Sequence, residues 1–157
     1  MTVRAWRIVK ARRAAGAFSG QGAKAWGGRW NSPGGAVVYT AGSAALAMLE
    51  MLAHLQDEAL LAHYVLFELT FDDALASSLP AAALPRAWRR FPLPAATQRI
   101  GDAWLAEARS AVLDVPSAIL PHERNYLLNP AHRDYGQIAI GPQRSGRLFE
   151  RFARPRR

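Results

Sequence analysis

The pattern of hydrophobic and polar positions divides the chain into short strands and two longer helical segments. Five runs rich in β-branched and aromatic residues predict strands; they are residues 3–9, 36–40, 63–71, 112–121, which Pro116 interrupts, and 137–141. Two helices are predicted, at residues 41–58 with Ser43 as N-cap and at residues 97–111 with Thr97 as N-cap. Residues 10–28, 77–97 and 122–136 are predicted as loops, with one short helical turn in the second. Because strands outnumber helices and lie far apart in the chain, an α+β fold is expected.

Length and composition indicate one soluble domain. The 157 residues carry a net charge of +8 and no cysteine, so disulfides and thiolate metal sites are excluded. The histidines lack the spacing of a metal site, and we expect no metal. Neither a signal peptide nor an apolar run of membrane-spanning length is present, which predicts a cytoplasmic protein without membrane contact. The expected domain covers residues 1–157, with a basic tail from about residue 142.

Glu50 is the most unusual position of the first predicted helix. At about 100° per residue, it falls within the arc marked by Leu46, Leu49 and Ala53. The rest of this helix is also apolar, and a helix that is apolar nearly all round is buried. A carboxylate there must be paired or used. The helix alone leaves two interpretations open, a structural ion pair and a functional acid.

The glycine-rich segment GGRWNSPGGAVVYT at residues 27–40 adds further chemistry. NSPGG accounts for a turn, whereas Arg29 and Trp30 are not needed for one. The turn and the helix can bring Arg29, Tyr39 and Glu50 into one cleft. A guanidinium, an aromatic ring and a carboxylate together suit a ligand with phosphates, a flat base and a ribose, as in NAD.

Other familiar sites are not supported by the sequence. Ser117 has no acid–base partner nearby in sequence and no G-x-S-x-G motif surrounds it. On sequence alone, a hydroxyl that bonds its own turn explains Ser117 equally well. The segment GQGAKAWGG does not match the P-loop and does not follow a strand in a βαβ unit.

Three ordered motifs resemble the RES domain family. They are GGRWNSPG, VVYTAGSAALAMLE and VPSAILPHERNYLLNPAH, with IGDAWL as a softer match. The resemblance covers nearly the whole chain, from residue 6 to residue 141. It implies a single compact domain similar to ADP-ribosyltransferases of the diphtheria-toxin type, NAD as substrate without a prosthetic group, and an Xre-family antitoxin as partner. The family's arginine, tyrosine, glutamate and serine correspond to Arg29, Tyr39, Glu50 and Ser117.

Four further residues are expected to contact NAD. Arg7 and Asn125 fall in matching motifs. Gly28 lets the backbone approach a ligand closely. Trp30 packs beneath Arg29 to fix its direction, and a core role is an equal alternative.

The resulting hypothesis is a toxin that consumes NAD by breaking its nicotinamide–ribose bond, by phosphorolysis or hydrolysis. A mono-ADP-ribosyltransferase that modifies a cellular protein is the first alternative. A basic nucleic-acid-binding module or RNA-acting toxin is the second, because of the charge and of the arginines and aromatics in RAWRRF. In the preferred hypothesis, nucleic acid is contacted through the antitoxin alone. A third alternative is an inactive interaction domain that keeps the fold.

Overall fold

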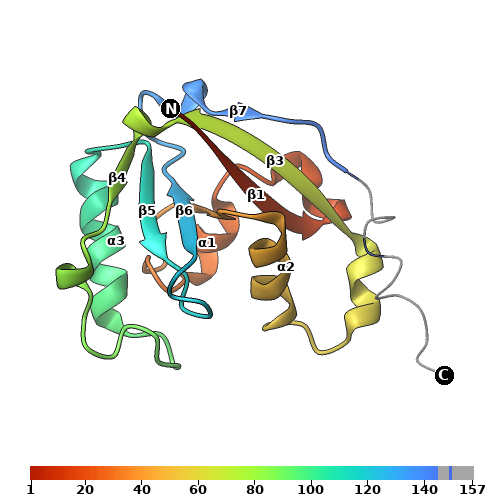
Figure 1. Ribbon diagram of the computed structural model, residues 1–157, viewed down its shortest axis with the longest axis horizontal. Helices are drawn as coiled ribbons and strands as arrows, with labels where there is room; N and C mark the ends of the chain where they lie inside the picture. Colours follow the sequence, from red (N-terminus) through yellow and green to blue (C-terminus); the bar gives the residue numbers. More distant parts are fainter. Residues whose placement is uncertain (145–148, 150–157) are drawn as a thin grey trace.

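The strands of the computed structural model form a seven-stranded sheet with the order β4-β5-β6-β2-β1-β3-β7 (Figure 1). The structure describes residues 1–144 and Phe149; most of the basic tail therefore lies outside the described residues. Strands β4 and β5 are parallel, and the other neighbours are antiparallel. The strands are Thr2–Lys10 (β1), Val38–Ala41 (β2), Tyr64–Asp72 (β3), Ala76–Ser78 (β4), Val112–Pro116 (β5), Arg124–Leu128 (β6) and Ala139–Ile140 (β7).

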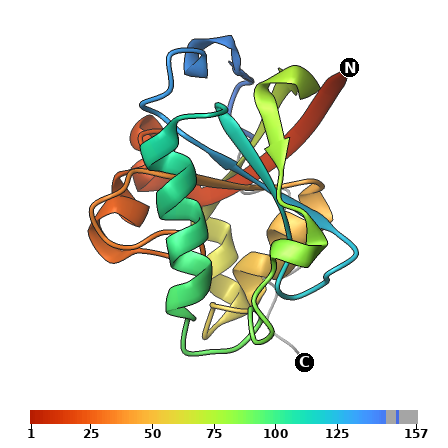
Figure 2. The same cartoon turned by 90° about the vertical axis from the view of Figure 1, so that its left-hand side faces the viewer.

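Helices cover the two halves of this sheet. The α-helices are Gln21–Trp26 (α1), Ala44–Leu52 (α2) and Ala95–Glu107 (α3). The short 3₁₀ segments are Ala11–Gly16 (η1), Glu58–His63 (η2), Asp73–Leu75 (η3), Ala81–Ala83 (η4) and Tyr135–Gln137 (η5). Figure 2 shows α3 lying across the strands β5 and β6. Within the described part of the chain, no helix has both the length and the hydropathy needed to cross a membrane.

The sheet curls at the junction between β1 and β2. Strand β1 pairs with β3 along its whole length, but with β2 at the single position Trp6–Ala41. In Figure 1, β1 and β3 accordingly run at a steep angle to β5 and β6. One apolar cluster joins α2 to β1 and β3, and another joins α3 to β5 and β6. The result is one compact α+β domain, as predicted.

The predicted strands are present, although several are shorter than expected. The first helix ends at Leu52 instead of residue 58. The second begins at Ala95, and Thr97 is not its N-cap, because its buried hydroxyl donates to the carbonyl oxygen of Pro94. Two predicted loops contain regular structure, with α1 inside residues 10–28 and β4 overlapping the start of residues 77–97.

The prediction of a loop at residues 122–136 was wrong in one important respect. Residues 124–128 form β6, which pairs with β5 on one side and β2 on the other. Five residues without clear alternation give a weak local signal. The two neighbouring strands, distant in sequence, supply the hydrogen bonds that make this segment a central strand.

Candidate active site

Helix α2 directs Glu50 toward the ends of two central strands, β5 and β6. The hydroxyl of Ser43 accepts the backbone N–H of Leu46 and caps the helix, as predicted. Leu46 and Ala47 are the buried residues of α2 and pack toward β1. Glu50 lies four and three residues beyond them, so it leaves the same side of the helix. Its half-buried side chain thereby reaches the end of β5 and the start of β6.

One carboxylate oxygen of Glu50 is held by two donors. The hydroxyl of Ser117 and the side-chain amide of Asn125 both donate to Oε1, each at 2.8 Å. Within the described residues, Oε2 has no hydrogen bond, and Glu50 forms no direct ion pair. The structural ion pair that the helix left open is therefore not present there. The carboxylate is fixed through one oxygen, and the other is available for a further hydrogen bond.

Ser117 is oriented by its own turn. The residue is fully buried just beyond β5, and its backbone N–H donates to the carbonyl oxygen of Glu123 at 2.9 Å. Its Oγ accepts the backbone N–H groups of Ile119 and Leu120 at 3.1 and 3.2 Å. Because these donors occupy the acceptor side of Oγ, the hydroxyl hydrogen is left for Glu50. Ser117 therefore bonds its own turn and the Glu50 carboxylate at the same time, and a role of its hydroxyl in catalysis stays a prediction.

Asn125 carries a polar atom without a partner. The residue lies on β6, opposite Ala41 of β2 and Val115 of β5. Its Nδ2 faces the Glu50 carboxylate, which fixes the orientation of the amide. Among the buried side-chain polar atoms of the described residues, its Oδ1 is the one without a hydrogen-bond partner. Such atoms are rare in folded proteins, and this one is suited to accept an N–H or O–H of a ligand.

Arg29 lies near Glu50 but is held by backbone carbonyl groups. Its Nη1 donates to the carbonyl oxygens of Trp88 and Arg90, at 2.7 and 3.1 Å. Burial is the main influence and lowers the pKa of Arg29, while the negative charge of Glu50 acts in the opposite direction. The predicted proximity of a cation and a carboxylate is therefore present. Neither charge is cancelled by direct contact.

Tyr39 supports the loop that carries Arg29. Its hydroxyl donates to Oδ1 of Asn31 at 2.6 Å and accepts the backbone N–H of Trp30 at 3.1 Å. Burial raises the pKa of Tyr39, so the hydroxyl stays protonated. A Cβ on Gly28 would lie 2.6 Å from this hydroxyl oxygen, which explains the glycine. Stacking of the Tyr39 ring on a ligand and ligand contact by Gly28 stay predictions.

Trp30 and Arg7 have supporting positions in the structure. Trp30 is 3% exposed and belongs to the apolar cluster beneath α3, which favours the core role that was one of its two interpretations.

Arg7 donates to the carbonyl oxygens of Ala17 and Tyr39, at 2.6 and 2.8 Å. Burial lowers the pKa of Arg7 to about 10. Trp6 packs toward α2. Because side chains alternate along a strand, the next residue, Arg7, lies on the other face of β1, away from Glu50. NAD contact by Arg7 is a prediction that this position does not favour.

Helix α3 fixes the loop of Arg29, which the sequence did not predict. The carboxylate of Asp102 accepts the backbone N–H and the hydroxyl of Ser32, at 2.9 and 2.6 Å. The side chain of Gln98 donates to the carbonyl oxygens of Gly28 and Asn31. A Cβ on Gly101 would lie 1.5 Å from the carbonyl oxygen of Trp30. The signal for this contact was the pair Gly101–Asp102 inside a helix, because both residue types are poor helix formers.

Arg89 was noted in the sequence only as part of RAWRRF, the segment that supports the nucleic-acid alternative. Its Nε and Nη2 donate to the carbonyl oxygens of Ala118 and Ile119, at 2.8 and 3.1 Å. These carbonyls belong to the turn that follows Ser117. The neighbouring residues Trp88 and Arg90 bind Arg29 through their own carbonyl groups. The loop before α3 therefore contacts both sides of the Glu50 site.

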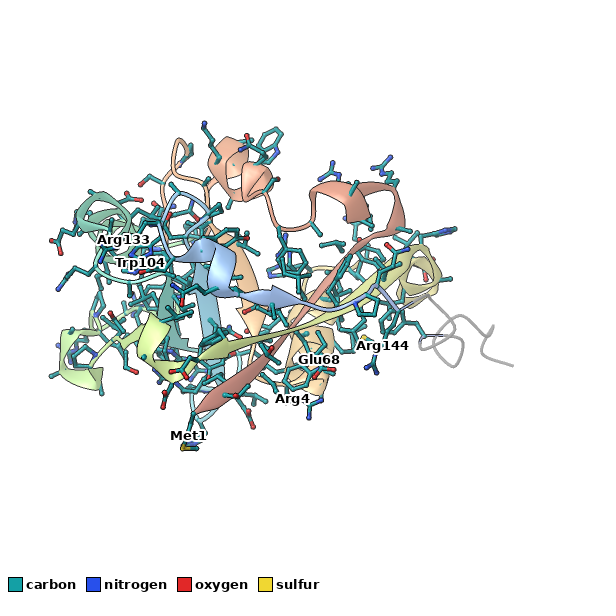
Figure 3. All side chains as sticks on the ribbon, turned by 90° about the horizontal axis from the view of Figure 1, so that it is seen from above. Met1, Arg4, Glu68, Trp104, Arg133 and Arg144 are labelled. Atoms are coloured by element: carbon teal, nitrogen blue, oxygen red, sulfur yellow. The ribbon has the colours of Figure 1, made fainter. Side chains whose placement is uncertain are left out.

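Two surface hollows lie elsewhere and lack this combination of groups. One is lined by Glu68, Leu69, Thr70 and residues of and near β7. Glu68 there is neutralised by Arg4 at 2.6 Å and by Arg144 at 3.4 Å, and Figure 3 shows it between the two arginines. The other is lined by residues of β4, β5 and α3, including Trp104. Among the described lining residues, neither hollow contains a carboxylate without an arginine partner.

Known proteins resemble this chain in sequence and in overall fold. A "Toxin Res" of Yersinia enterocolitica is 43% identical over 130 residues, which cover 83% of this chain and 86% of the relative. A "Prs ADP-ribosylating toxin" of a Sphingobium species is 42% identical over 139 residues, covering 85% and 86%. In structure, the chain is similar to one from the M. tuberculosis MbcT-MbcA toxin-antitoxin complex, with a TM-score of 0.75 and 23% identity over 98% of this chain and 90% of that chain. Residues 4–148 match the RES domain, and the chain belongs to the RES domain family.

Proposed function

We propose that this protein is the toxin of a bacterial toxin–antitoxin system and that it cleaves the nicotinamide–ribose bond of NAD. The observation that carries the proposal is the Glu50 carboxylate, which Ser117 and Asn125 hold at Oε1 while Oε2 stays available. Arg29 places a positive charge nearby. The names of both relatives, which are called toxins, support the biological part of the proposal.

The chemistry follows from what a fixed carboxylate does beside a breaking glycosidic bond. When the bond between the ribose carbon and the nicotinamide nitrogen breaks, its electron pair stays with nicotinamide, which leaves uncharged. The ribose then carries positive charge, and Glu50 stabilises it. Because Ser117 and Asn125 hold Oε1 in advance, the carboxylate does not have to reorganise as this charge develops.

The other groups bind and orient the dinucleotide. The unpaired Oδ1 of Asn125 accepts a hydrogen bond from a ribose hydroxyl or from the nicotinamide amide. Arg29 binds phosphate or ribose with the N–H groups that its contacts to Trp88 and Arg90 leave over. Tyr39 holds the loop of Arg29 through Asn31.

We propose water or inorganic phosphate as the acceptor. Water adds a hydroxyl group to the ribose carbon, releases a proton and gives ADP-ribose. Phosphate adds through one of its oxygens and gives ADP-ribose phosphorylated at that carbon. Glu50 has the same role in both reactions, so the acceptor is decided by what enters the site.

Transfer of ADP-ribose to a protein is the second candidate. It is favoured by the Sphingobium relative, whose name describes ADP-ribosylation of Prs. In this reaction a side chain of the target attacks the ribose carbon and gives up its proton. The bond broken in NAD and the role of Glu50 are unchanged.

An antitoxin of the Xre family is the proposed partner. The structural neighbour comes from a toxin–antitoxin complex, and the net charge of +8 suits an acidic face on a partner. Purification of the protein together with the product of the adjacent gene tests this. A small acidic protein in a stable complex supports the proposal, and recovery of the free protein from that co-expression contradicts it.

Nicotinamide release is the direct test of the activity. The purified protein is incubated with NAD, with and without phosphate, and the products are separated and identified by mass. ADP-ribose indicates hydrolysis, its phosphorylated form indicates phosphorolysis, and a modified protein indicates transfer. Glu50→Gln is expected to abolish release. The matched control is Glu107→Gln, which changes a carboxylate at the exposed end of α3, paired with Arg109. Unchanged NAD with the folded wild type under every condition contradicts the proposal.

A further inference from the structure

The loop between β4 and α3 brings a second guanidinium to the Glu50 site. On one side its backbone carbonyls at Trp88 and Arg90 accept hydrogen bonds from Arg29. On the other side the Arg89 side chain donates to the carbonyls of Ala118 and Ile119. Arg89 thus reaches the turn that orients Ser117, while its neighbours in the chain hold Arg29.

The two guanidinium groups are close enough for their charges to interact. The positive charge of Arg89 lowers the pKa of Arg29, in addition to the larger effect of burial. The ion pairs of the described residues include neither arginine. Their partners are carbonyl oxygens, which orient a guanidinium without cancelling its charge. The free protein therefore holds two like charges together, and an anion between them removes the repulsion.

Donors for such an anion remain on both side chains. Arg29 uses only Nη1 in its contacts with Trp88 and Arg90, so Nε and Nη2 are left over. Arg89 uses Nε and Nη2, so Nη1 is left over, and its side chain is exposed. Guanidinium groups that carbonyl contacts hold in fixed directions are well suited to bind phosphate oxygens.

We propose that Arg89 and Arg29 together bind the diphosphate of the dinucleotide, an inference that rests on the proposed function. The charges match along the ligand. The two negative charges of the diphosphate face two guanidinium groups, and the cationic nicotinamide ring faces the single carboxylate of Glu50. Arg29 is common to both regions, since it contacts the loop before α3 that carries Arg89 and lies near enough to Glu50 for their charges to interact. The dinucleotide is thereby bound in one direction.

Binding measurements with parts of the ligand test this assignment. ADP-ribose carries the diphosphate, and nicotinamide riboside lacks it. Arg89→Gln is expected to weaken ADP-ribose binding about 10- to 100-fold, the range for a charge-assisted hydrogen bond, and to leave nicotinamide riboside binding unchanged. Arg89→Lys is expected to retain part of the affinity. The matched control Arg109→Gln, at the end of α3 beside Glu107, is expected to bind both ligands as the wild type does.

The possible results separate this inference from the proposed function. Equal weakening of both ligands by Arg89→Gln overturns it, because Arg89 then acts by positioning the Ser117 turn. Unchanged ADP-ribose binding, or none in the folded wild type, overturns it too, even if NAD is cleaved. Selective weakening supports it even if no nicotinamide is released, in which case the proposed reaction fails and the anion site stands.

Discussion

The hydroxyl of Ser117 donates to Oε1 of Glu50 at 2.8 Å, across 67 residues of sequence. The same oxygen of Ser117 accepts the backbone N–H groups of Ile119 and Leu120. The turn after β5 is therefore connected to the carboxylate on α2 through one atom. A change at Ser117 should affect both the turn and the orientation of Glu50.

Ser117→Ala is expected to lower kcat about 10- to 100-fold and the free energy of unfolding by about 1–3 kcal/mol. Both effects follow from a lost hydrogen bond to a charged group and from two backbone N–H groups left without their acceptor. The measurements are nicotinamide release and urea denaturation. Ser110→Ala is the matched control, because the buried Ser110 bonds Trp104 and the carbonyl of Val112 instead of Glu50. Ser110→Ala should lower the free energy of unfolding and leave kcat unchanged. Full activity of folded Ser117→Ala would show that Glu50 does not need this donor.

Asn125→Asp is expected to make activity fall as the pH rises. The substitution replaces a donor to Glu50 by a second carboxylate. At low pH the two carboxyl groups can share a proton, whereas at higher pH both ionise and repel. The measurement is the pH profile of kcat, compared with that of the wild type. Asn129→Asp is the control, since Asn129 follows the other end of β6 and its Oδ1 accepts the N–H of Ala131, as an aspartate also can. A pH profile identical to that of the wild type contradicts the assigned contact.

Gly101→Ala is expected to destabilise the protein by more than about 3 kcal/mol and to reduce activity. The new Cβ would lie 1.5 Å from the carbonyl oxygen of Trp30, so α3 must move away from the loop that carries Arg29. Thermal unfolding and nicotinamide release are the measurements. Gly22→Ala is the matched control. Gly22 lies in the helix α1, and a Cβ at this position would meet no neighbouring atom within 4 Å. It should be neutral or stabilising by about 0.5–1 kcal/mol, and similar melting temperatures for the two variants would contradict the close contact.

The position of Glu50 could be predicted because helical periodicity is a local property. Once α2 begins at Ser43, the spacing to Leu46 and Ala47 determines which side Glu50 leaves. The spacing does not determine its partners. Asn125 lies on β6, which forms by pairing with two strands distant in sequence, and the short segment alone indicated a loop.

The supporting contacts were also beyond local reasoning. Arg29 and Trp30 looked unusual in a turn, but nothing nearby in sequence showed that α3 packs on them or that Arg89 lies close. These contacts join segments about 60 to 70 residues apart and depend on how the sheet curls. Residue type and spacing therefore indicated candidate chemical groups, and the tertiary structure supplied their contacts and orientation.

Tyr39→Phe is expected to lower the free energy of unfolding by about 1–3 kcal/mol at neutral pH, with a loss that depends on pH. The hydroxyl donates to Asn31 and accepts from Trp30, and phenylalanine leaves both without a partner. Burial raises the pKa of Tyr39 above its ordinary value of 10.0. A group with a raised pKa in the folded state contributes stability that is complete below about pH 10 and is lost as the pH rises further toward the folded-state pKa.

The difference in stability between wild type and Tyr39→Phe should therefore be constant from about pH 7 to 9 and shrink above about pH 10. Urea denaturation across this range measures it, and taking the difference cancels the titration of the tyrosines that both proteins share. A difference that stays constant well above pH 10 would contradict a buried, protonated Tyr39.

Because phenylalanine keeps the ring, the affinity of the same variant for nicotinamide riboside tests the hydroxyl apart from stacking. Tyr39→Leu then removes the ring itself, and a further loss of affinity is expected if Tyr39 stacks on nicotinamide.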